Sequence, residues 1–317
     1  MRLLKQQRGV ALITAMLAVA LAALIAADLV WEQHLQLRRT SGLLAQEQGR
    51  MYALGAESWA IEILLDDRET PEDIDHLLEL WAEDLPPLEL DEGSLLGKLE
   101  DLQGRFNVNN LYRNGQVDRI AFEQFERLLQ IVGAEQQLAG AVLDWIDADQ
   151  DVCCAGGAED DTYTSKDPPY FAANRYITST SELMAVEGMN LEEYRKLEPY
   201  IAALPPEWCG PGEFTPINVN TAPEQVLLAL SPDVTQGNVD QWVSEREDFD
   251  GYRDFSAFQT VVPEDYINGN YLSLNSECFG ATAVISIGTF RFSMYSLLDR
   301  QGEAGNIVTR VRYFGVY

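Results

Sequence analysis

The sequence predicts an α+β protein in which a long N-terminal helix packs on a small antiparallel sheet, with a large α-helical insertion interrupting that sheet. Three observations lead to this prediction. An apolar run near the N-terminus continues into amphipathic sequence with helical spacing. Alternating segments occur near residue 100 and again after residue 270, and the roughly 155 residues between them are mostly helical in their periodicity.

Composition excludes several classes of function. The 317 residues include 51 acidic and 22 basic side chains, giving a formal net charge of -29, which opposes binding to nucleic acid. Only two histidines occur, His34 and His76, which argues against a zinc enzyme or a Ser-His-Asp triad. The sequence also lacks a Gly-rich phosphate loop, an HExxH motif and a nucleophile elbow. We therefore expect no enzymatic activity.

The N-terminal apolar run is long enough to cross a membrane. Residues Val10 to Ala27 contain a single polar side chain, Thr14, and as a helix they would span roughly 27 Å. Three basic residues precede the run, which predicts a cytoplasmic N-terminus with the rest of the chain across the membrane. A plain signal anchor and a cleaved secretory signal are alternatives, since Ala22-Ala23-Leu24 and Ala26-Ala27-Asp28 offer small-residue cleavage sites.

Helical spacing of apolar residues continues well beyond the apolar run. No proline occurs before Pro71, so the pattern predicts one helix from about Val10 to about Leu65. The alternative is a membrane helix joined to a separate core helix, with the break at Gly42 or Gly55.

The expected strands lie at both ends of the remaining sequence. Residues 95–111 alternate, with Gly104 as a turn or bulge. Further strands are expected over 271–279, 281–298 and 307–317, forming antiparallel hairpins with a turn at Gly302 to Gly305. Because the segment between the two groups is helical, the sequence predicts an insertion into one domain.

Two parts of this segment look alike, and the second resembles a helix-hairpin-helix module. RFNVNNL at 105–111 and PINVNTAPEQVLLAL at 216–230 each precede a helical run. Asn218 and Thr221 are expected as helix caps, and Pro223 in the first helical turn. The hairpin at 231–234 replaces the phosphate-binding Gly-x-Gly by Ser-Pro-Asp-Val, and residues 111–267 hold 9 basic and 29 acidic side chains. The module is therefore expected to be a rigid scaffold that binds no nucleic acid.

An acidic tract from Asp144 to Asp161 carries seven carboxylates and no basic residue. Such crowding is unfavourable unless a positive charge lies inside it. Asp147, Asp149 and Asp151 have the alternate spacing of an EF-hand calcium loop, but Val152 and Ala158 replace its glycine and its closing glutamate. Glu159 and Asp160 are near enough to complete an oxygen shell by another path. The alternative is a solvated acidic loop.

Four cysteines are compatible with an extracytoplasmic location. Cys153, Cys154, Cys209 and Cys278 allow three pairings, of which the vicinal Cys153–Cys154 bond is strained. A bridge to Cys209 would anchor the acidic tract, and free buried thiols are the alternative to any bridge. Sequence alone does not select among these.

The N-terminal sequence RGVALITAMLAVALA resembles the signal of type IV pilins and type II secretion pseudopilins. That resemblance implies cleavage after Gly9 and N-methylation of Val10 by a prepilin peptidase. Most members carry glutamate at the fifth mature position, which is Thr14 here. Within the family, its loss is associated with the GspK minor pseudopilins, thought to cap the pseudopilus tip.

The order of elements also looks like the GspK family. The resemblance implies a pilin-like fold with a leader at 1–9, a transmembrane and filament-core helix at 10–30, a pilin-like domain at 31–111 and 268–317, and an inserted helical domain at 112–267. GAEDDTY and PPYFAAN resemble the calcium-binding region of that family, where two ions lie in the insertion. The implied calcium ligands are Asp147, Asp149, Asp151, Glu159 and Asp160, with Asn174 as an amide ligand.

The implied function is that of a minor pseudopilin of the type II secretion system. It would cap the pseudopilus with GspI and GspJ and support protein export across the outer membrane. The implied location is the bacterial inner membrane, crossed once, with the large C-terminal domain in the periplasm. The alternative is a membrane-anchored extracytoplasmic binding module that uses its helix-hairpin-helix-like region.

Overall fold

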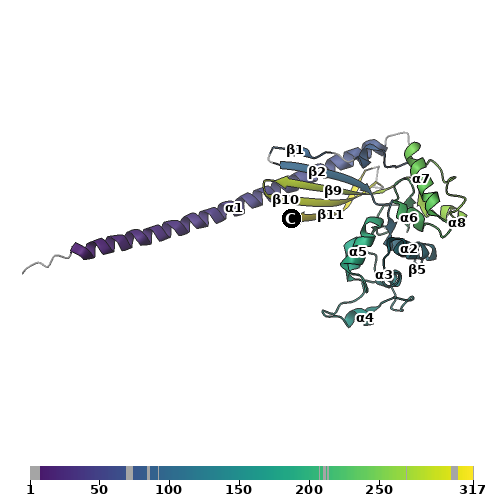
Figure 1. Ribbon diagram of the computed structural model, residues 1–317, viewed down its shortest axis with the longest axis horizontal. Helices are drawn as coiled ribbons and strands as arrows, with labels where there is room; N and C mark the ends of the chain where they lie inside the picture. Colours follow the sequence, from purple (N-terminus) through teal and green to yellow (C-terminus); the bar gives the residue numbers. More distant parts are fainter. Residues whose placement is uncertain are drawn as a thin grey trace, which may run out of the picture.

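The computed structural model describes residues 8–68, 74–83, 86–91, 93–206, 208–209, 212, 214–268, 270–300 and 306–316. Residues 1–7 of the expected leader and the expected turn at 302–305 lie outside this described part. One long helix projects from a head that holds a sheet and a group of shorter helices (Figure 1).

The long helix, α1, runs without a break from Arg8 to Arg68. The predicted single helix is therefore confirmed, and the alternative break at Gly42 or Gly55 is wrong. Gly49 instead allows α1 to pack closely on the sheet, because a Cβ atom at this position would lie 2.6 Å from the Phe292 ring. The apolar first half of α1 is exposed throughout, and burial begins only at Ala45.

The sheet has five antiparallel strands in the order β1-β2-β9-β10-β11. Their bounds are Leu88–Leu90, Gly93–Asp101, Cys278–Ile287, Phe290–Asp299 and Val308–Val316. The expected single strand at 281–298 is wrong, because a turn at Gly288, with φ 55°, divides it into the paired strands β9 and β10. The expected strand at 271–279 is only partly correct. Residues 274–277 are not in a strand, and Leu272–Ser273 (β8) pairs with Ile217–Asn218 and not with the five-stranded sheet.

The pairing of β2 with β9 joins segments far apart in the sequence. Asp101 at the end of β2 lies opposite Phe279, and the described residues between them form a separate part of the head (Figure 1). We call residues 102–277 the helical region. The α+β fold with a helical insertion is thus confirmed.

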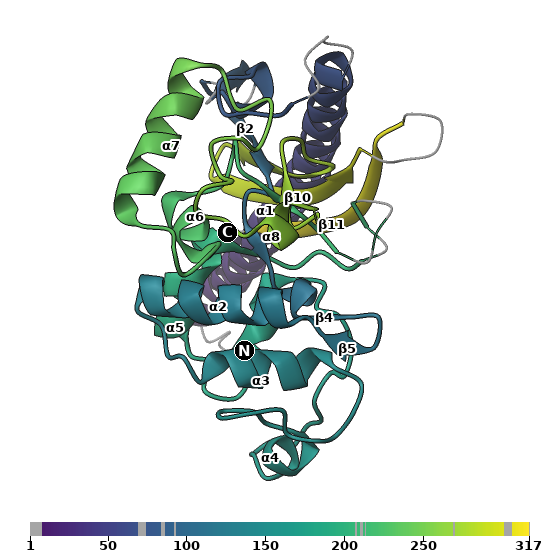
Figure 2. The same ribbon diagram turned by 90° about the vertical axis from the view of Figure 1, so that its right-hand side faces the viewer.

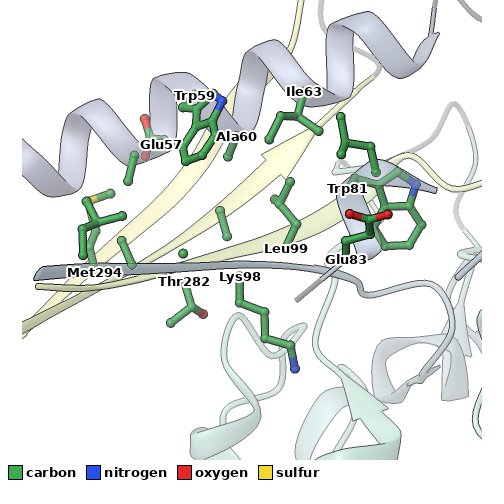
Figure 3. A pocket seen from close by; sticks show the side chains of 16 residues that line it. Glu57, Trp59, Ala60, Ile63, Trp81, Glu83, Lys98, Leu99, Thr282 and Met294 are labelled. Atoms are coloured by element: carbon green, nitrogen blue, oxygen red, sulfur yellow. The ribbon is translucent and has the colours of Figure 1, made fainter. Parts of the chain in front are cut away.

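One face of the sheet packs on α1. Trp59 and Ile63 of α1 point toward Leu99 of β2, while Trp81 of a short 3-10 turn (Leu80–Ala82) closes the end of this apolar groove (Figure 3). Lys98, the neighbour of Leu99, points away from the helix, as the alternation of a strand requires (Figure 3).

An ion pair between a buried carboxylate and a half-exposed arginine joins α1 to the edge strand β11. Arg312 of β11 donates two hydrogen bonds to Glu57 of α1, at 2.7 and 2.6 Å, and Ser296 and Thr309 donate to the same carboxylate. Burial by itself would raise the pKa of Glu57, but the hydrogen bonds from Arg312 and Ser296 outweigh it and lower that pKa. Glu57 is therefore held as a carboxylate beneath the sheet.

The helical region contains seven α-helices and three short strand pairs within the described residues. The helices are α2 (Arg119–Val132), α3 (Leu138–Ile146), α4 (Asp160–Thr164), α5 (Leu191–Leu197), α6 (Glu224–Ala229), α7 (Gln236–Asp248) and α8 (Glu264–Asn268). The strand pairs are β3 (Phe106–Asn107) with β6 (Ile201–Ala202), β4 (Tyr112–Arg113) with β5 (Gln116–Val117), and β7 (Ile217–Asn218) with β8. Helix α4 lies at the outer end of the region in both views (Figure 1, Figure 2).

One continuous apolar core fills this region, from Phe106 to Leu272. It extends a few residues beyond both limits of the expected 112–267 insertion, because the short strands at 106–107 and 272–273 pair within the helical region.

The expected caps of α6 are wrong. Pro223 occupies the N-cap position itself, and no side chain caps the helix. Asn218 donates instead to the Asp75 carbonyl and to Ser276 Oγ, and Thr221 donates to the fully buried Asp101. These polar side chains join the helical region to the end of the sheet, a tertiary use that local sequence does not reveal.

Candidate metal centre

The centre begins at the C-terminal end of α3. The apolar sequence of this helix buries all nine of its residues, so Asp144 near its end is drawn inside with 0% of its surface exposed. The helix ends at Asp147, whose extended backbone turns the chain away while its side chain remains 3% exposed. Because Asp144 and Asp147 are three residues apart, both carboxylates lie on the same side of the helix end.

Glu159 approaches from the following loop. It stands at the N-cap position of α4, where its side chain makes no capping hydrogen bond, and it is 4% exposed. One carboxylate oxygen from each of Asp147, Asp149 and Glu159 lies within 4.8 Å of the others. The fold therefore gathers three acidic side chains at one point.

Five oxygen atoms in the described part of the chain are buried without a hydrogen-bond partner, and all belong to this neighbourhood. They are Asp144 Oδ2, Asp147 Oδ1, both carboxylate oxygens of Glu159, and Asn174 Oδ1. The Asn174 backbone N–H donates to the Trp145 carbonyl at 3.0 Å, which brings the asparagine beside α3. Buried acceptors without donors are unfavourable, so this group requires a cation or protons.

The electrostatics agree with that requirement. Burial, reinforced by the charges of Asp149 and Asp144, raises the pKa of Asp147 to about 7. Burial and the charges of Asp144 and Asp147 likewise raise the pKa of Glu159 to about 7. No basic side chain is paired with either carboxylate among the described contacts. The donor set consists only of carboxylate and amide oxygens, which suits a hard cation such as calcium and not a thiophilic metal.

The expected ligands are only partly brought together. Asp147, Asp149 and Glu159 converge, and the orphaned Asn174 oxygen lies beside α3. Asp151 is exposed, with its backbone N–H donating to Asp149 Oδ1 at 2.8 Å. The Asp160 carboxylate instead accepts the Ala172 backbone N–H at 2.9 Å. Neither Asp151 nor Asp160 belongs to the converging group.

Asp144 is the residue that the expected ligand set omitted. The signal that could have found it is its place three residues before Asp147 in an otherwise apolar helix. A carboxylate within such a run must be buried, and a buried carboxylate must have a partner.

The cysteines pair differently from the bridge considered for the acidic tract. Cys209 is bonded to Cys278 at the start of β9, with a Cα–Cα distance of 5.1 Å, so the disulfide joins the helical region to the sheet. Cys153 and Cys154 are exposed and not in a disulfide. Of the pairings that the sequence left open, a bridge from the acidic tract to Cys209 is therefore not formed.

The N-terminal part of α1 is apolar and long enough to cross a membrane, and none of its apolar stretch is buried in the protein. Val10 is exposed, and the Thr14 hydroxyl donates to the Ala11 carbonyl of its own helix at 3.0 Å. These features are consistent with a single-pass membrane anchor.

Comparison with known proteins identifies the family to which the chain is similar. Two family models, both described as type II secretion system protein K, match residues 104–206 and 217–272. Type II secretion system protein K of Pseudomonas aeruginosa is 36% identical, over 98% of this chain and 93% of the relative. The Klebsiella pneumoniae protein of the same name is 31% identical, over 98% of both chains.

Among solved structures, a chain of the GspK-GspI-GspJ complex from enterotoxigenic Escherichia coli matches with a TM-score of 0.75 and 25% identity. The match covers 87% of this chain and 99% of that one. Together with the fold of a long helix on an antiparallel sheet, these matches support a minor pseudopilin role in type II secretion. The chain belongs to the type II secretion system protein K family.

Proposed function

We propose that this protein caps the tip of a type II pseudopilus together with GspI-like and GspJ-like partners. The observation that carries the proposal is the position of the helical region. It lies at the end of α1 remote from Val10 and extends well to one side of the helix axis (Figure 1). Further subunits stacked beyond that end would collide with it, whereas a terminal subunit has open space there.

Thr14 supports the same placement. In filament-forming relatives, a glutamate at this position would pair with the N-terminal amine of the next subunit. Residues 10–27 contain no carboxylate, and the Thr14 hydroxyl is already bonded within its helix. Such a subunit lacks the group that recruits a successor. The relative of known structure was solved with GspI and GspJ, which points to partners of that kind here.

An exposed apolar face of α1 is the proposed contact with these partners. Leu43, Leu44 and Met51 remain largely exposed although they lie beside the sheet. Leu54 is partly buried against the sheet and contributes less. Trp59 is exposed at the rim of the groove in Figure 3. Because the protein is strongly acidic, apolar contacts are better suited than charge to hold acidic neighbours.

Co-purification tests this assignment. The full chain, in detergent with tagged GspI and GspJ from the same organism, should form a defined complex and should not polymerise alone. Met51→Arg should weaken the complex, while Gln241→Arg, on the exposed face of α7, should leave it intact. Long fibres formed by the unmodified chain, or a failure to bind either partner, would refute tip capping. A Thr14→Glu variant should also fail to form long fibres, because the helical region still blocks stacking.

The proposal includes processing at the N-terminus. A prepilin peptidase would cut after Gly9 and methylate Val10, leaving the apolar helix in the inner membrane and the head in the periplasm. Mass spectrometry of the mature protein from its native host tests this directly. Gly9→Leu should block the cut, whereas Val10→Phe, which keeps an apolar first residue, should not. A mature protein that begins near Asp28 would show that the apolar run is a cleaved secretory signal and not an anchor.

Finally, we propose that calcium occupies the metal centre and has a structural role, in a protein without enzymatic activity. Asp147, Asp149 and Glu159 would hold the ion, with Asp144 and Asn174 as the further oxygen donors. The bound cation would supply the positive charge that this acidic neighbourhood lacks. The buried oxygen atoms without hydrogen-bond partners support this assignment. Calorimetric titration of the full chain with calcium, and with magnesium as the control, measures occupancy.

A further inference from the structure

Cys153 and Cys154 occupy a distinctive position beside the metal centre. Both thiols are exposed, and their Sγ atoms lie 2.7 Å apart. The chain has four cysteines, and the other two are joined in a buried disulfide. Within the chain, each of the two exposed thiols therefore has only its neighbour as a bonding partner.

The turn that carries the pair rests directly on α3. The Cys153 backbone N–H donates to Asp144 Oδ1 at 3.1 Å, leaving Asp144 Oδ2 as one of the buried oxygens without a partner. A Cβ atom at Gly140 would lie 2.9 Å from Cys154 Sγ, so the thiol touches the first half of the helix. The Cys154 carbonyl accepts the Gly157 N–H at 3.0 Å, only two residues before Glu159. Movement of this turn would therefore displace two carboxylates of the centre.

We propose that Cys153 and Cys154 form a reversible vicinal disulfide that tightens the calcium centre. This inference rests on the proposed binding of calcium. The thiols already approach each other while the Cys153 N–H is bonded to Asp144, so the ring closes with little movement of the turn. Closure restricts the loop between Asp147 and Glu159 before an ion arrives, and pre-organisation of this kind strengthens binding.

The step balances with a disulfide oxidant, either glutathione disulfide or a thiol-oxidising protein. One cysteine thiolate attacks the oxidant's sulfur, forms a mixed disulfide and releases one thiol. The second thiolate attacks its neighbour's sulfur, closes the Cys153–Cys154 ring and releases the oxidant's other thiol. The two cysteines lose two protons and two electrons, and the oxidant gains them.

The ring is expected to open again under mild reduction. Adjacent Cα atoms lie about 3.8 Å apart, which is closer than the usual range across a disulfide, so a vicinal bond is strained. Strained and exposed disulfides are the ones most easily reduced. The Cys209–Cys278 bond is buried and should resist the same conditions.

The test compares calcium binding by the full chain, in detergent, after glutathione disulfide and after a mild dithiol reductant. Oxidation should remove two titratable thiols and make the peptide that contains both cysteines lighter by two hydrogen atoms. Calorimetry should then show calcium binding about tenfold tighter in the oxidised form, the gain expected from freezing roughly one residue in advance. Cys154→Ser should bind with the weaker affinity under both conditions. Ala155→Ser, which alters the same turn but keeps both thiols, should retain the difference.

Each contrary result has a distinct meaning. Equal affinity in the two forms would overturn the redox proposal while leaving the calcium centre intact. Two free thiols after oxidation, or a disulfide-linked dimer of the chain, would overturn the intramolecular ring. If neither form binds calcium, the calcium centre itself is refuted, and the thiol count and peptide mass still decide the ring.

Discussion

The sheet and the helical region bury carboxylates in opposite ways. Beneath the sheet, Glu57 receives two hydrogen bonds from Arg312, and its pKa is lowered. In the helical region, Asp147 and Glu159 are buried without a basic partner, and the pKa of each is raised to about 7. The chain supplies a basic partner for Glu57, whereas the described contacts include none for Asp147 or Glu159. We therefore expect the stability of the helical region to depend on the cations that the solution supplies.

Removal of calcium should have the largest effect. A ligand that binds only the folded state stabilises it by about 2.7 kcal/mol at a hundredfold excess over its Kd. For a head of this size we expect melting in chelator to occur roughly 5 to 10 °C below melting in calcium. Thermal unfolding followed by circular dichroism measures the difference. Equal midpoints would show that the acidic tract is a solvated loop that binds no stabilising ion.

The effect of Glu159→Gln on the free energy of unfolding should change sign when calcium is removed. With calcium present, the variant should lose most of the ion's stabilisation, since a buried ligand is gone. In chelator it should be more stable than the unmodified protein by about 1 kcal/mol, because repulsion with Asp144 and Asp147 is relieved. Asp161→Asn removes an exposed charge from the same tract and is the matched control. Destabilisation of equal size in both conditions would contradict the model.

Glu57→Gln should act independently of calcium. Breaking a buried ion pair costs about 3–5 kcal/mol, but Arg312 is nearly half exposed, so we expect a loss of about 2 kcal/mol. Denaturant unfolding measures it, with Glu62→Gln on the exposed side of α1 as the control. A loss that appears only in calcium would show that the two regions are not independent.

The smallest effect is the pH dependence of the Glu57 pair. Because the folded-state pKa of Glu57 is lowered from about 4.5, its contribution is present above that pH and is lost as pH falls through the folded value. The stability difference between the unmodified protein and Glu57→Gln should therefore shrink by about 1 kcal/mol between pH 6 and pH 3. Unfolding curves at both values, in chelator, test this. A difference that grows toward low pH would contradict the assigned direction.

Local pattern was enough to predict the long helix and the extended character of the C-terminal segments. In α1 the spacing of apolar residues and the absence of proline act along one element, so no distant contact is needed to interpret them. Alternation over 281–298 likewise predicted extended structure, but not the turn at Gly288 that divides this segment into β9 and β10. The acidic tract also predicted a cation site, because seven carboxylates without a base are unfavourable in any fold, and that site stays a prediction.

Tertiary structure alone decided which side chains meet. Asp147 and Glu159 converge because the end of α3 buries the first and the start of α4 places the second beside it. Cys209 pairs with Cys278 because the helical region returns its chain to the start of β9, 69 residues later. Asn218 and Thr221, which look like caps, are used across the junction with the sheet. Sequence determines local conformation and the need for a partner, whereas the partner's identity depends on distances that only the folded chain defines.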